Sequence, residues 1–188
     1  MYAGNGTSQI LYRDPDVFLF DFHQHPRTLY PGTGYIYEIG EEEGKGYNMN
    51  LPMVPRAGDA QFLKGIDELF IPIINQFKPD IVLVSAGFDT HFSDPITQLN
   101  ITIPGYGEII KKVKEGVKKV CDGKIVILLE GGYDLKSLSR GILTEISVLG
   151  ELGIEFIDDT PKIEEGIVEY NNKMIDKIKE VFSPYWNF

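Results

Sequence analysis

The chain has 188 residues and a formal net charge of −10 at neutral pH, which is enough sequence for one domain with its own core. The acidic balance argues against direct binding to nucleic acid, because contacts to phosphates need clustered Lys and Arg. No apolar stretch approaches the roughly 20 residues that cross a bilayer, and the first residues lack the pattern of a signal peptide. Together with a single cysteine, Cys121, which suits a reducing compartment, these features predict a cytoplasmic protein that contacts neither nucleic acid nor membrane.

Three apolar runs predict β-strands, at residues 17–23, 81–86 and 125–129. The second and third are apolar almost throughout, which is typical of strands buried on both faces of a parallel sheet. Residues 24–56 are rich in Gly and Pro, so we expect a long ordered loop there. Loops of this length inside compact domains are usually functional.

Apolar residues at helical spacing predict four helices. The first covers residues 59–77 and is expected to kink at Pro72. The second has Pro104 in its first turn, the third runs over about 134–151, and the fourth opens at Pro161. Strands that alternate with helices of this length indicate βαβ units and a parallel sheet.

Two features predict an incomplete domain. The chain opens on a Gly-rich turn at residues 4–7 with no strand before it, and three strands make a thin sheet for four helices. A buried parallel sheet needs cover on both faces and protection at its edges. We therefore expect a single partial domain over residues 1–188, with a helical extension at 160–182 that has only a packing role.

Two strand ends place chemically capable side chains at one edge of the predicted sheet. Asp89 follows the second strand and Tyr133 follows the third, and ligands of open α/β sheets bind beyond the carboxyl ends of the strands. The Asp89 carboxylate can ligate a metal, act as a base or cap the following turn. The Tyr133 phenol can donate a hydrogen bond to a developing oxyanion, or it can be an ordinary buried tyrosine.

Other candidates have a structural interpretation beside the functional one. His91 forms an Asp-x-His pair with Asp89 that could bind a metal, but its side chain could equally point into the wall of the fold. Tyr30 could form an aromatic pocket wall or simply pack within its loop. Asp94 precedes a proline and is expected to start a turn, and His23 is expected to be a hydrogen-bonded core histidine.

Six segments of the chain, in their order and approximate spacing, together resemble the zinc-dependent histone deacetylase superfamily. That superfamily includes acetoin-utilisation and acetylpolyamine amidohydrolases. The resemblance covers about residues 4–150 and implies an α/β, three-layer, parallel-sheet arginase/deacetylase-like fold whose N-terminal half is missing. The segments are Gly4-Asn5-Gly6-Thr7, His23-Gln24, Tyr30-Pro31-Gly32-Thr33-Gly34, Gly46-Tyr47-Asn48-Met49-Asn50-Leu51-Pro52, Ser85-Ala86-Gly87-Phe88-Asp89 with Asp94-Pro95, and Glu130-Gly131-Gly132-Tyr133.

The resemblance implies a role for each matched residue in the hydrolysis of acetyl-lysine or acetyl-amine amides. Asp89 matches an aspartate ligand of the catalytic zinc, and Tyr133 matches the tyrosine that polarises the acetyl carbonyl. Gly131 and Gly132 match a glycine wall, and Tyr30 matches an aromatic wall of the acyl-lysine tunnel. In the family, zinc activates a water and a pair of histidines moves the proton.

The resemblance also implies sites for a monovalent cation, potassium or sodium, that brace the zinc loop. Asp21 departs from the serine often found at its position. The matching backbone carbonyls are those of Asp21, Phe22, Leu11, Asp14, Val17 and Tyr47.

The departures from the family pattern concern the rest of the metal site. The pattern before Gly-Asn-Gly-Thr is Asp-x-His-His, but here Tyr2 stands at the ligand-histidine position and the aspartate has no counterpart. The histidine pair is absent as well. One carboxylate does not hold a three-ligand catalytic zinc, so we expect that this chain alone neither binds zinc tightly nor hydrolyses amides.

Three functional hypotheses follow. In the first, the chain is the C-terminal portion of a deacetylase and contributes Asp89 and Tyr133 to a site that a complementary N-terminal chain completes. In the second, it is a non-catalytic subunit or pseudoenzyme whose exposed apolar flank packs against a partner or another copy. In the third, it is a small-molecule hydrolase with a relocated metal at Asp89 and His91.

Overall fold

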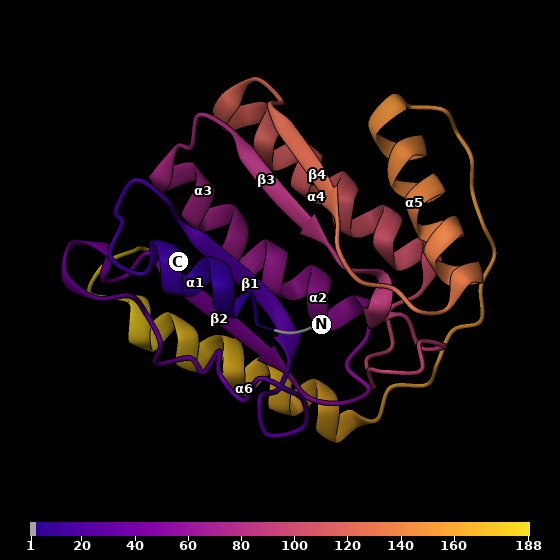
Figure 1. Cartoon of the computed structure of the whole chain (residues 1–188), viewed down its shortest axis with the longest axis horizontal. Coiled ribbons are helices and arrows are strands. Elements are labelled where there is room, and N and C mark those ends of the chain that lie inside the picture. Colours follow the sequence, from indigo (N-terminus) through magenta and orange to yellow (C-terminus); the bar gives the residue numbers. More distant parts are fainter. Residues whose placement is uncertain (1–2) are drawn as a thin grey trace.

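The computed structural model describes residues 3–188, and these form parallel strands with helices packed around them (Figure 1). The strands are β1 (Leu19–Gln24), β2 (Asn48–Met53), β3 (Val82–Ala86) and β4 (Ile125–Leu129). Within the described residues, β1 pairs only with β2 and β3 only with β4, both in parallel. The α/β class and the parallel pairing agree with the sequence-based prediction. Tyr2, which the sequence analysis compared with a ligand histidine, lies outside the described residues.

The prediction of a loop over residues 24–56 was wrong in one respect, because β2 lies inside that segment. The sequence of β2, NMNLPM, contains two asparagines and a proline, yet all six residues are buried. Pro52 stands opposite His23. It is tolerated because hydrogen bonds to β1 involve alternate residues of β2, such as Met53, whose carbonyl accepts from the His25 N–H.

The helices lie close to their predicted positions, with one addition at the start of the chain. Thr102 and Asp134 cap α4 and α5, each accepting a hydrogen bond from the backbone N–H three residues later. The short helix α1 was not predicted. The helices are α1 (Asn5–Leu11), α2 (Asp59–Gly65), α3 (Ile71–Phe77), α4 (Ile103–Cys121), α5 (Leu135–Gly150) and α6 (Glu165–Phe182), with 3₁₀ turns η1 (Glu42–Gly44) and η3 (Phe88–Thr90).

Two helix predictions need correction. The kink expected at Pro72 is instead a π-helical segment, η2 (Ile66–Phe70), which ends just before Pro72 and joins α2 to α3. A proline inside a helix lacks an N–H and its ring meets the carbonyl four residues earlier, so the irregularity lies in the preceding turn. Helix α6 begins at Glu165 and not at Pro161. No helix within residues 3–188 is long and apolar enough to cross a membrane.

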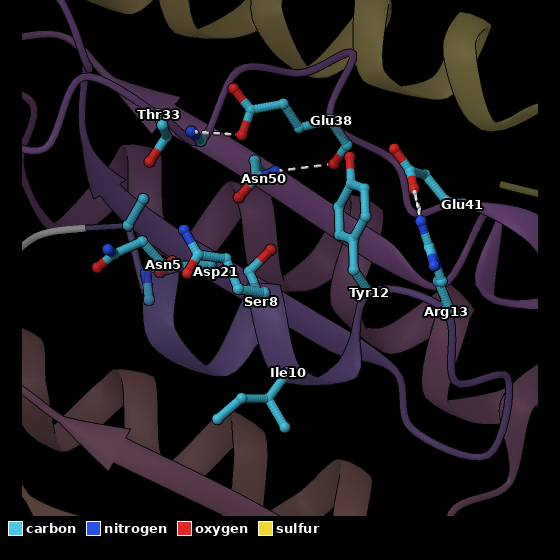
Figure 2. A pocket seen from close by; sticks show the side chains of 14 residues that line it. Asn5, Ser8, Ile10, Tyr12, Arg13, Asp21, Thr33, Glu38, Glu41 and Asn50 are labelled. Atoms are coloured by element: carbon cyan, nitrogen blue, oxygen red, sulfur yellow. Dashed lines mark hydrogen bonds and ion pairs between the residues drawn. The ribbon is translucent and has the colours of Figure 1, made fainter.

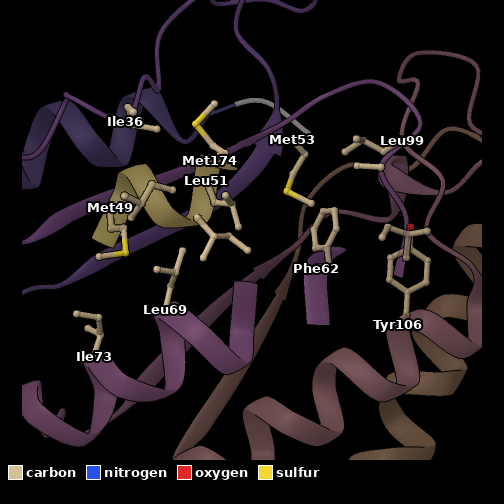
Figure 3. Close-up of a cluster of buried hydrophobic side chains, with 14 of the residues drawn as sticks. Ile36, Met49, Leu51, Met53, Phe62, Leu69, Ile73, Leu99, Tyr106 and Met174 are labelled. Atoms are coloured by element: carbon tan, nitrogen blue, oxygen red, sulfur yellow. The ribbon is translucent and has the colours of Figure 1, made fainter. Parts of the chain in front are cut away.

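One face of β1 and β2 packs on helices. Met49, Leu51 and Met53 of β2 are fully buried, and Figure 3 shows them in one cluster with Met174 of α6 and Leu69 of the η2 segment. This cluster is the main core of the chain.

The opposite face of β1 and β2 is covered by α1 and the segment after β1. Asn48 accepts a hydrogen bond from the Ser8 hydroxyl at 3.0 Å and donates to the Glu38 carbonyl at 2.6 Å. Asn50 donates to the same carbonyl at 3.1 Å. These hydrogen bonds offset the cost of burying the two amides. The strands β1 and β2, here named the covered pair, are therefore covered on both faces.

Residues 3–188 cover only one face of strands β3 and β4, here named the open pair. Their inner face packs on α4, where Ile110, Val113 and Val117 are buried. On the other face Leu83 is 63% exposed and Leu128 is 48% exposed. One face of these strongly apolar strands is therefore left uncovered by the described residues.

Candidate active site

Asp89 lies at the carboxyl end of β3, in the 3₁₀ turn η3. Its side chain is only 2% exposed, and its backbone carbonyl accepts a hydrogen bond from the Thr97 hydroxyl. The preceding residue, Phe88, donates its N–H to the carbonyl of Gly131 at 2.8 Å. This bond joins the loop after β3 to the loop after β4.

The glycines after β4 allow that loop to lie directly against Asp89. A Cβ atom at Gly131 would collide with the Asp89 carboxylate. Gly132 has φ +145°, a conformation that favours glycine, and a Cβ there would lie 3.1 Å from the Cβ of Phe88. The structure thus brings together Asp89, Gly131 and Gly132.

Tyr133 is fixed through its backbone, and its side chain reaches solvent. Its N–H donates to Asp94 Oδ2 at 2.8 Å, while Asp94 Oδ1 accepts from the Ile96 N–H at 2.9 Å. Asp94 therefore forms the predicted turn and also holds the tyrosine loop, a second role that the sequence did not reveal. The Tyr133 side chain is 51% exposed and is available to a ligand.

The Asp89 carboxyl has a shifted pKa. Burial raises the pKa of the Asp89 carboxyl above its ordinary value, and the neighbouring Asp94 carboxylate raises it further. A cation at this position would reverse that effect, because a positive charge stabilises the carboxylate.

A second layer of polar groups supports this arrangement. The Tyr106 hydroxyl donates to the Phe88 carbonyl at 3.0 Å and lies 2.9 Å from the Thr90 hydroxyl. Burial raises the pKa of Tyr106 well above its ordinary value, so this phenol stays protonated and can donate. The sequence did not identify Tyr106 or Thr97, because a tyrosine in an amphipathic helix and a threonine in a loop carry no local signal of this role.

His91 lies in the wall of the fold, which was one of the two interpretations of this residue. Its Nδ1 lies 2.8 Å from the Ser93 hydroxyl and its Nε2 lies 2.8 Å from Asp158 Oδ2. Asp158 also accepts from the Ile103 N–H at 3.0 Å, so Asp158 joins the segment after α5 to His91 and to the start of α4. Both ring nitrogens are used in this structural contact.

The residues on the β1 side of the site are more dispersed. Tyr30 lies on the segment after β1 and is 73% exposed. Gln24, at the end of β1, accepts a hydrogen bond from the Gln98 N–H at 2.8 Å, which joins this strand end to the loop beside Asp89. His23 is fully buried and lies 2.9 Å from the Gly34 carbonyl, as expected of a core histidine.

Asp21 borders a cavity of about 360 Å³ between α1, β1 and the segment after β1 (Figure 2). Figure 2 shows Glu38, Glu41 and Asp21 around this space. Burial opposes ionisation of Asp21, but His23 and the Gly4 N–H, which is 2.6 Å from Oδ2, outweigh it and lower the pKa of Asp21. Phe22 follows in β1 and points its ring to the other face, where it stacks on Phe62.

The other carbonyls expected at a monovalent-cation site come from two adjacent segments. The Leu11 carbonyl accepts from the Asp14 N–H at 3.0 Å, and the Tyr47 carbonyl accepts from the Leu19 N–H at 2.9 Å. The segments touch at Gly44, where a Cβ would lie 2.8 Å from the Asp14 nitrogen. Val17 lies between Asp14 and β1.

The described residues do not complete a zinc site. Among residues 3–188 there is no group of three or more His, Cys, Asp or Glu side chains that could hold a metal ion. A catalytic zinc takes three protein ligands, and Asp89 could provide one of them.

The sequence and the fold have clear relatives. Residues 1–149 match the histone deacetylase domain family. The chain is 37% identical to a probable deacetylase of Archaeoglobus fulgidus over 98% of its own length and 54% of that protein. It is 40% identical to the chloroplastic histone deacetylase 14 of Arabidopsis thaliana over 86% of its length and 38% of that protein. The chain thus spans about half or less of these relatives.

Solved structures agree with these sequence matches. The histone deacetylase Clr3 superposes with a TM-score of 0.85 at 29% identity, covering 99% of this chain and 30% of that one. The HD domain of HDA15 superposes with a TM-score of 0.83 at 29% identity, covering 98% of this chain and 48% of that one. The expected arginase/deacetylase-like fold is therefore confirmed, and the chain belongs to the histone deacetylase family.

Proposed function

We propose that this chain carries the Asp89 and Tyr133 part of a deacetylase active site that hydrolyses acetyl-lysine or acetyl-amine amides. The observation that supports this most strongly is the fit of Gly131 against the Asp89 carboxylate, which leaves no room for a side chain. The proposal is also supported by the exposure of the Tyr133 side chain, on the same loop as Gly131, to solvent.

The chain's own residues have distinct tasks in this proposal. Tyr133 donates a hydrogen bond to the acetyl carbonyl oxygen and stabilises the negative charge that develops there. Asp94 positions Tyr133 through its backbone N–H, and Gly131 and Gly132 with Tyr30 border the acyl group. Asp89 supplies one ligand to a zinc ion, whose chemistry when bound is to activate a water and polarise the carbonyl.

The proposal requires further ligands from outside residues 3–188, so we expect no turnover from this chain alone. The test is acetate release from an acetyl-lysine peptide with added zinc. Turnover by the isolated chain that disappears in Asp89→Ala would contradict the proposal. Asp89→Asn keeps the shape of the side chain and removes its charge, so it separates the loss of the carboxylate from the loss of packing.

A non-catalytic role is the second candidate, and the exposed face of the open pair favours it. A large apolar patch marks an interaction surface, and a subunit could use this patch without any chemistry. One result separates the two functions. A complex of the chain with its partner that binds zinc and releases acetate supports the catalytic role. A complex that does neither supports the non-catalytic role.

We also propose that potassium or sodium binds the backbone carbonyls of Leu11, Asp14, Val17 and Tyr47, with a second site at Asp21 and Phe22. The close packing of residues 11–14 on 44–47 supports the first of these sites. The measurement is thermal unfolding in potassium, sodium or choline chloride at equal ionic strength. A higher melting temperature in potassium or sodium is expected, and equal temperatures in all three salts would contradict the proposal.

A further inference from the structure

Ser93, His91 and Asp158 form a hydrogen-bonded row of side chains, here named the serine row. The Ser93 hydroxyl lies 2.8 Å from His91 Nδ1, and His91 Nε2 lies 2.8 Å from Asp158 Oδ2. A hydroxyl, an imidazole and a carboxylate in this order are the groups with which enzymes activate a serine nucleophile. The serine meets Nδ1 here and Nε2 in serine proteases, but the order of the three groups is the same.

The hydrogen bonds of His91 place the proton of its ring on Nε2. Nδ1 lies 3.2 Å from the Ser93 backbone nitrogen, whose N–H can only donate. Nδ1 therefore carries a lone pair, and Nε2 carries the proton that it donates to the Asp158 carboxylate. Because the lone pair lies within hydrogen-bond distance of the Ser93 hydroxyl, His91 has the position of a general base.

The base of the serine row is fixed, whereas its nucleophile is accessible. His91 is only 3% exposed, and its backbone carbonyl accepts from the Asp94 N–H at 2.9 Å. Asp158 accepts a second hydrogen bond, from the Ile103 N–H at 3.0 Å. Ser93 is exposed. A substrate can therefore reach the hydroxyl while the imidazole is shielded from bulk water.

The start of α5 provides N–H groups close to Ser93. Ser137 lowers the pKa of Asp134, and the Ser93 hydroxyl lowers it further, which places Ser93 beside the N-cap of α5. The first N–H groups of a helix have no partner within the helix. Asp134 accepts that of Ser137 at 2.7 Å, and those of Leu135 and Lys136 have no acceptor among residues 3–188. They are available to negative charge that develops beside Ser93.

We propose that the serine row is a second acyl-transfer site, in which Ser93 is the nucleophile, His91 is the general base and Asp158 positions His91. Its substrate is a carboxylic ester with a short acyl group and a good leaving group, such as an aryl acetate. No metal ion is required, because the imidazole activates the hydroxyl. This inference goes beyond the proposed deacetylase function and does not depend on it.

The first step of this reaction forms an acyl-serine. Ser93 Oγ attacks the carbonyl carbon of the ester while His91 Nδ1 takes the hydroxyl proton. The bond from that carbon to the alcohol oxygen then breaks, and the alcohol takes the proton from Nδ1. Asp158 stabilises the imidazolium that exists between these two proton transfers.

The second step releases the acid and restores the serine. A water molecule attacks the acyl carbon while Nδ1 of His91 takes one of its protons. The bond to Ser93 Oγ breaks, and Oγ takes the proton from Nδ1. The sum of both steps is one ester and one water converted to one acid and one alcohol, with the chain unchanged.

The test is hydrolysis of para-nitrophenyl acetate by the full chain in the presence of EDTA. We expect turnover above the rate in buffer, equal rates with and without EDTA, and the same rate in Asp89→Asn. Ser93→Ala, at an exposed position, should lower the rate by roughly tenfold or more. Ser139→Ala is the matched control and should leave the rate unchanged, because that exposed hydroxyl donates to the Lys136 carbonyl.

A fluorophosphonate probe tests the identity of the nucleophile. It reacts with activated serines and stays attached, so mass spectrometry of the digested chain finds the modified residue. We expect modification at Ser93, and none of the remaining serines modified in Ser93→Ala.

Asp158→Asn tests the positioning role. Asparagine keeps the shape of the side chain and an oxygen for the Ile103 N–H, but it lacks the charge that stabilises protonated His91. We expect kcat for the ester to fall by about tenfold with KM unchanged. Thermal unfolding is measured beside the kinetics. A lower melting temperature with an unchanged kcat would show that Asp158 is only structural and would contradict its assignment.

Four results would overturn the serine row as an acyl-transfer site. They are the absence of turnover by the folded chain, equal rates in Ser93→Ala and the unchanged chain, loss of turnover in EDTA, and a fluorophosphonate attached only to other residues. Failure of the deacetylase proposal is a separate result, because that proposal concerns amide hydrolysis with zinc and depends on Asp89.

Discussion

The covered pair and the open pair are built alike but enclosed differently. Both are parallel pairs of strands resting on helices, yet the covered pair has the more polar sequence and the open pair the more apolar one. Strand β2, with its two asparagines, is entirely buried, whereas β4, with the sequence IVILL, leaves Val126, Leu128 and Leu129 exposed. The apolar composition of a strand therefore does not predict how deeply that strand is buried within this chain.

The difference follows from what lies on the second face. In the covered pair, α1 and the segment after β1 supply hydrogen-bond partners that allow Asn48 and Asn50 to be buried. The open pair has the near-continuous apolar sequence of strands that are covered on both sides. One face of this pair nevertheless has no cover among residues 3–188.

The largest expected contrast is between two leucines in strands. Leu51→Ala in β2 removes a fully buried side chain and is expected to lower the free energy of unfolding by about 2–5 kcal/mol. Leu83→Ala in β3 removes a side chain that is 63% exposed and should cost less than about 1 kcal/mol. Urea unfolding of both variants measures this, and equal losses would mean that the open face is covered in solution.

A pH-dependent contribution is expected from the helices behind the open pair. Burial raises the pKa of Glu145 in α5 from 4.5 to about 7, so the folded chain holds this proton more tightly than the unfolded chain. Stability from Glu145 is thus full below pH 4.5 and falls by about 2–3 kcal/mol as the pH rises to about 7.

Glu145→Gln should remove this loss while keeping the shape of the side chain. Unfolding by urea at pH 5 and at pH 8 measures the effect in both proteins. The account of Glu145 is wrong if the variant retains the same difference in stability between the two pH values.

Two glycines sharpen the contrast in packing. Gly65 in α2 lies under the covered pair, and a Cβ there would be 2.5 Å from Leu51 and 2.6 Å from Phe22. Gly65→Ala is therefore expected to destabilise the chain by about 1–3 kcal/mol. Gly166→Ala in α6 meets nothing within 4 Å and is expected to stabilise by about 0.5–1 kcal/mol. Thermal unfolding measures the stability of both variants. If Gly65→Ala leaves the stability unchanged, the covered pair is loosely packed.

The sequence predicted the elements whose signals are local. Apolar runs located β1, β3 and β4, and the capping residues Thr102 and Asp134 precede helices that were predicted within a few residues. The position of Asp89 beside the glycines after β4 was also predictable, because both follow parallel strands and must lie at one edge.

The features that escaped prediction depend on contacts distant in sequence. Strand β2 was missed because the partners of its asparagines, the Ser8 hydroxyl and the Glu38 carbonyl, are not visible in a local pattern. The supporting roles of Thr97 and Tyr106 were missed for the same reason. The sequence also does not reveal that the described strands form two separate pairs, because a local pattern does not say which strands become neighbours.

Amide hydrogen exchange along β3 in the isolated chain tests the central claim most directly. The claim is that the open pair has a free edge and a free face, whereas the covered pair is enclosed. The account predicts fast exchange at Leu83 and Ser85, whose N–H groups are directed away from β4, and slow exchange at Val84 between them. Equal protection at all three amides would show that the edge is already paired and would contradict the account.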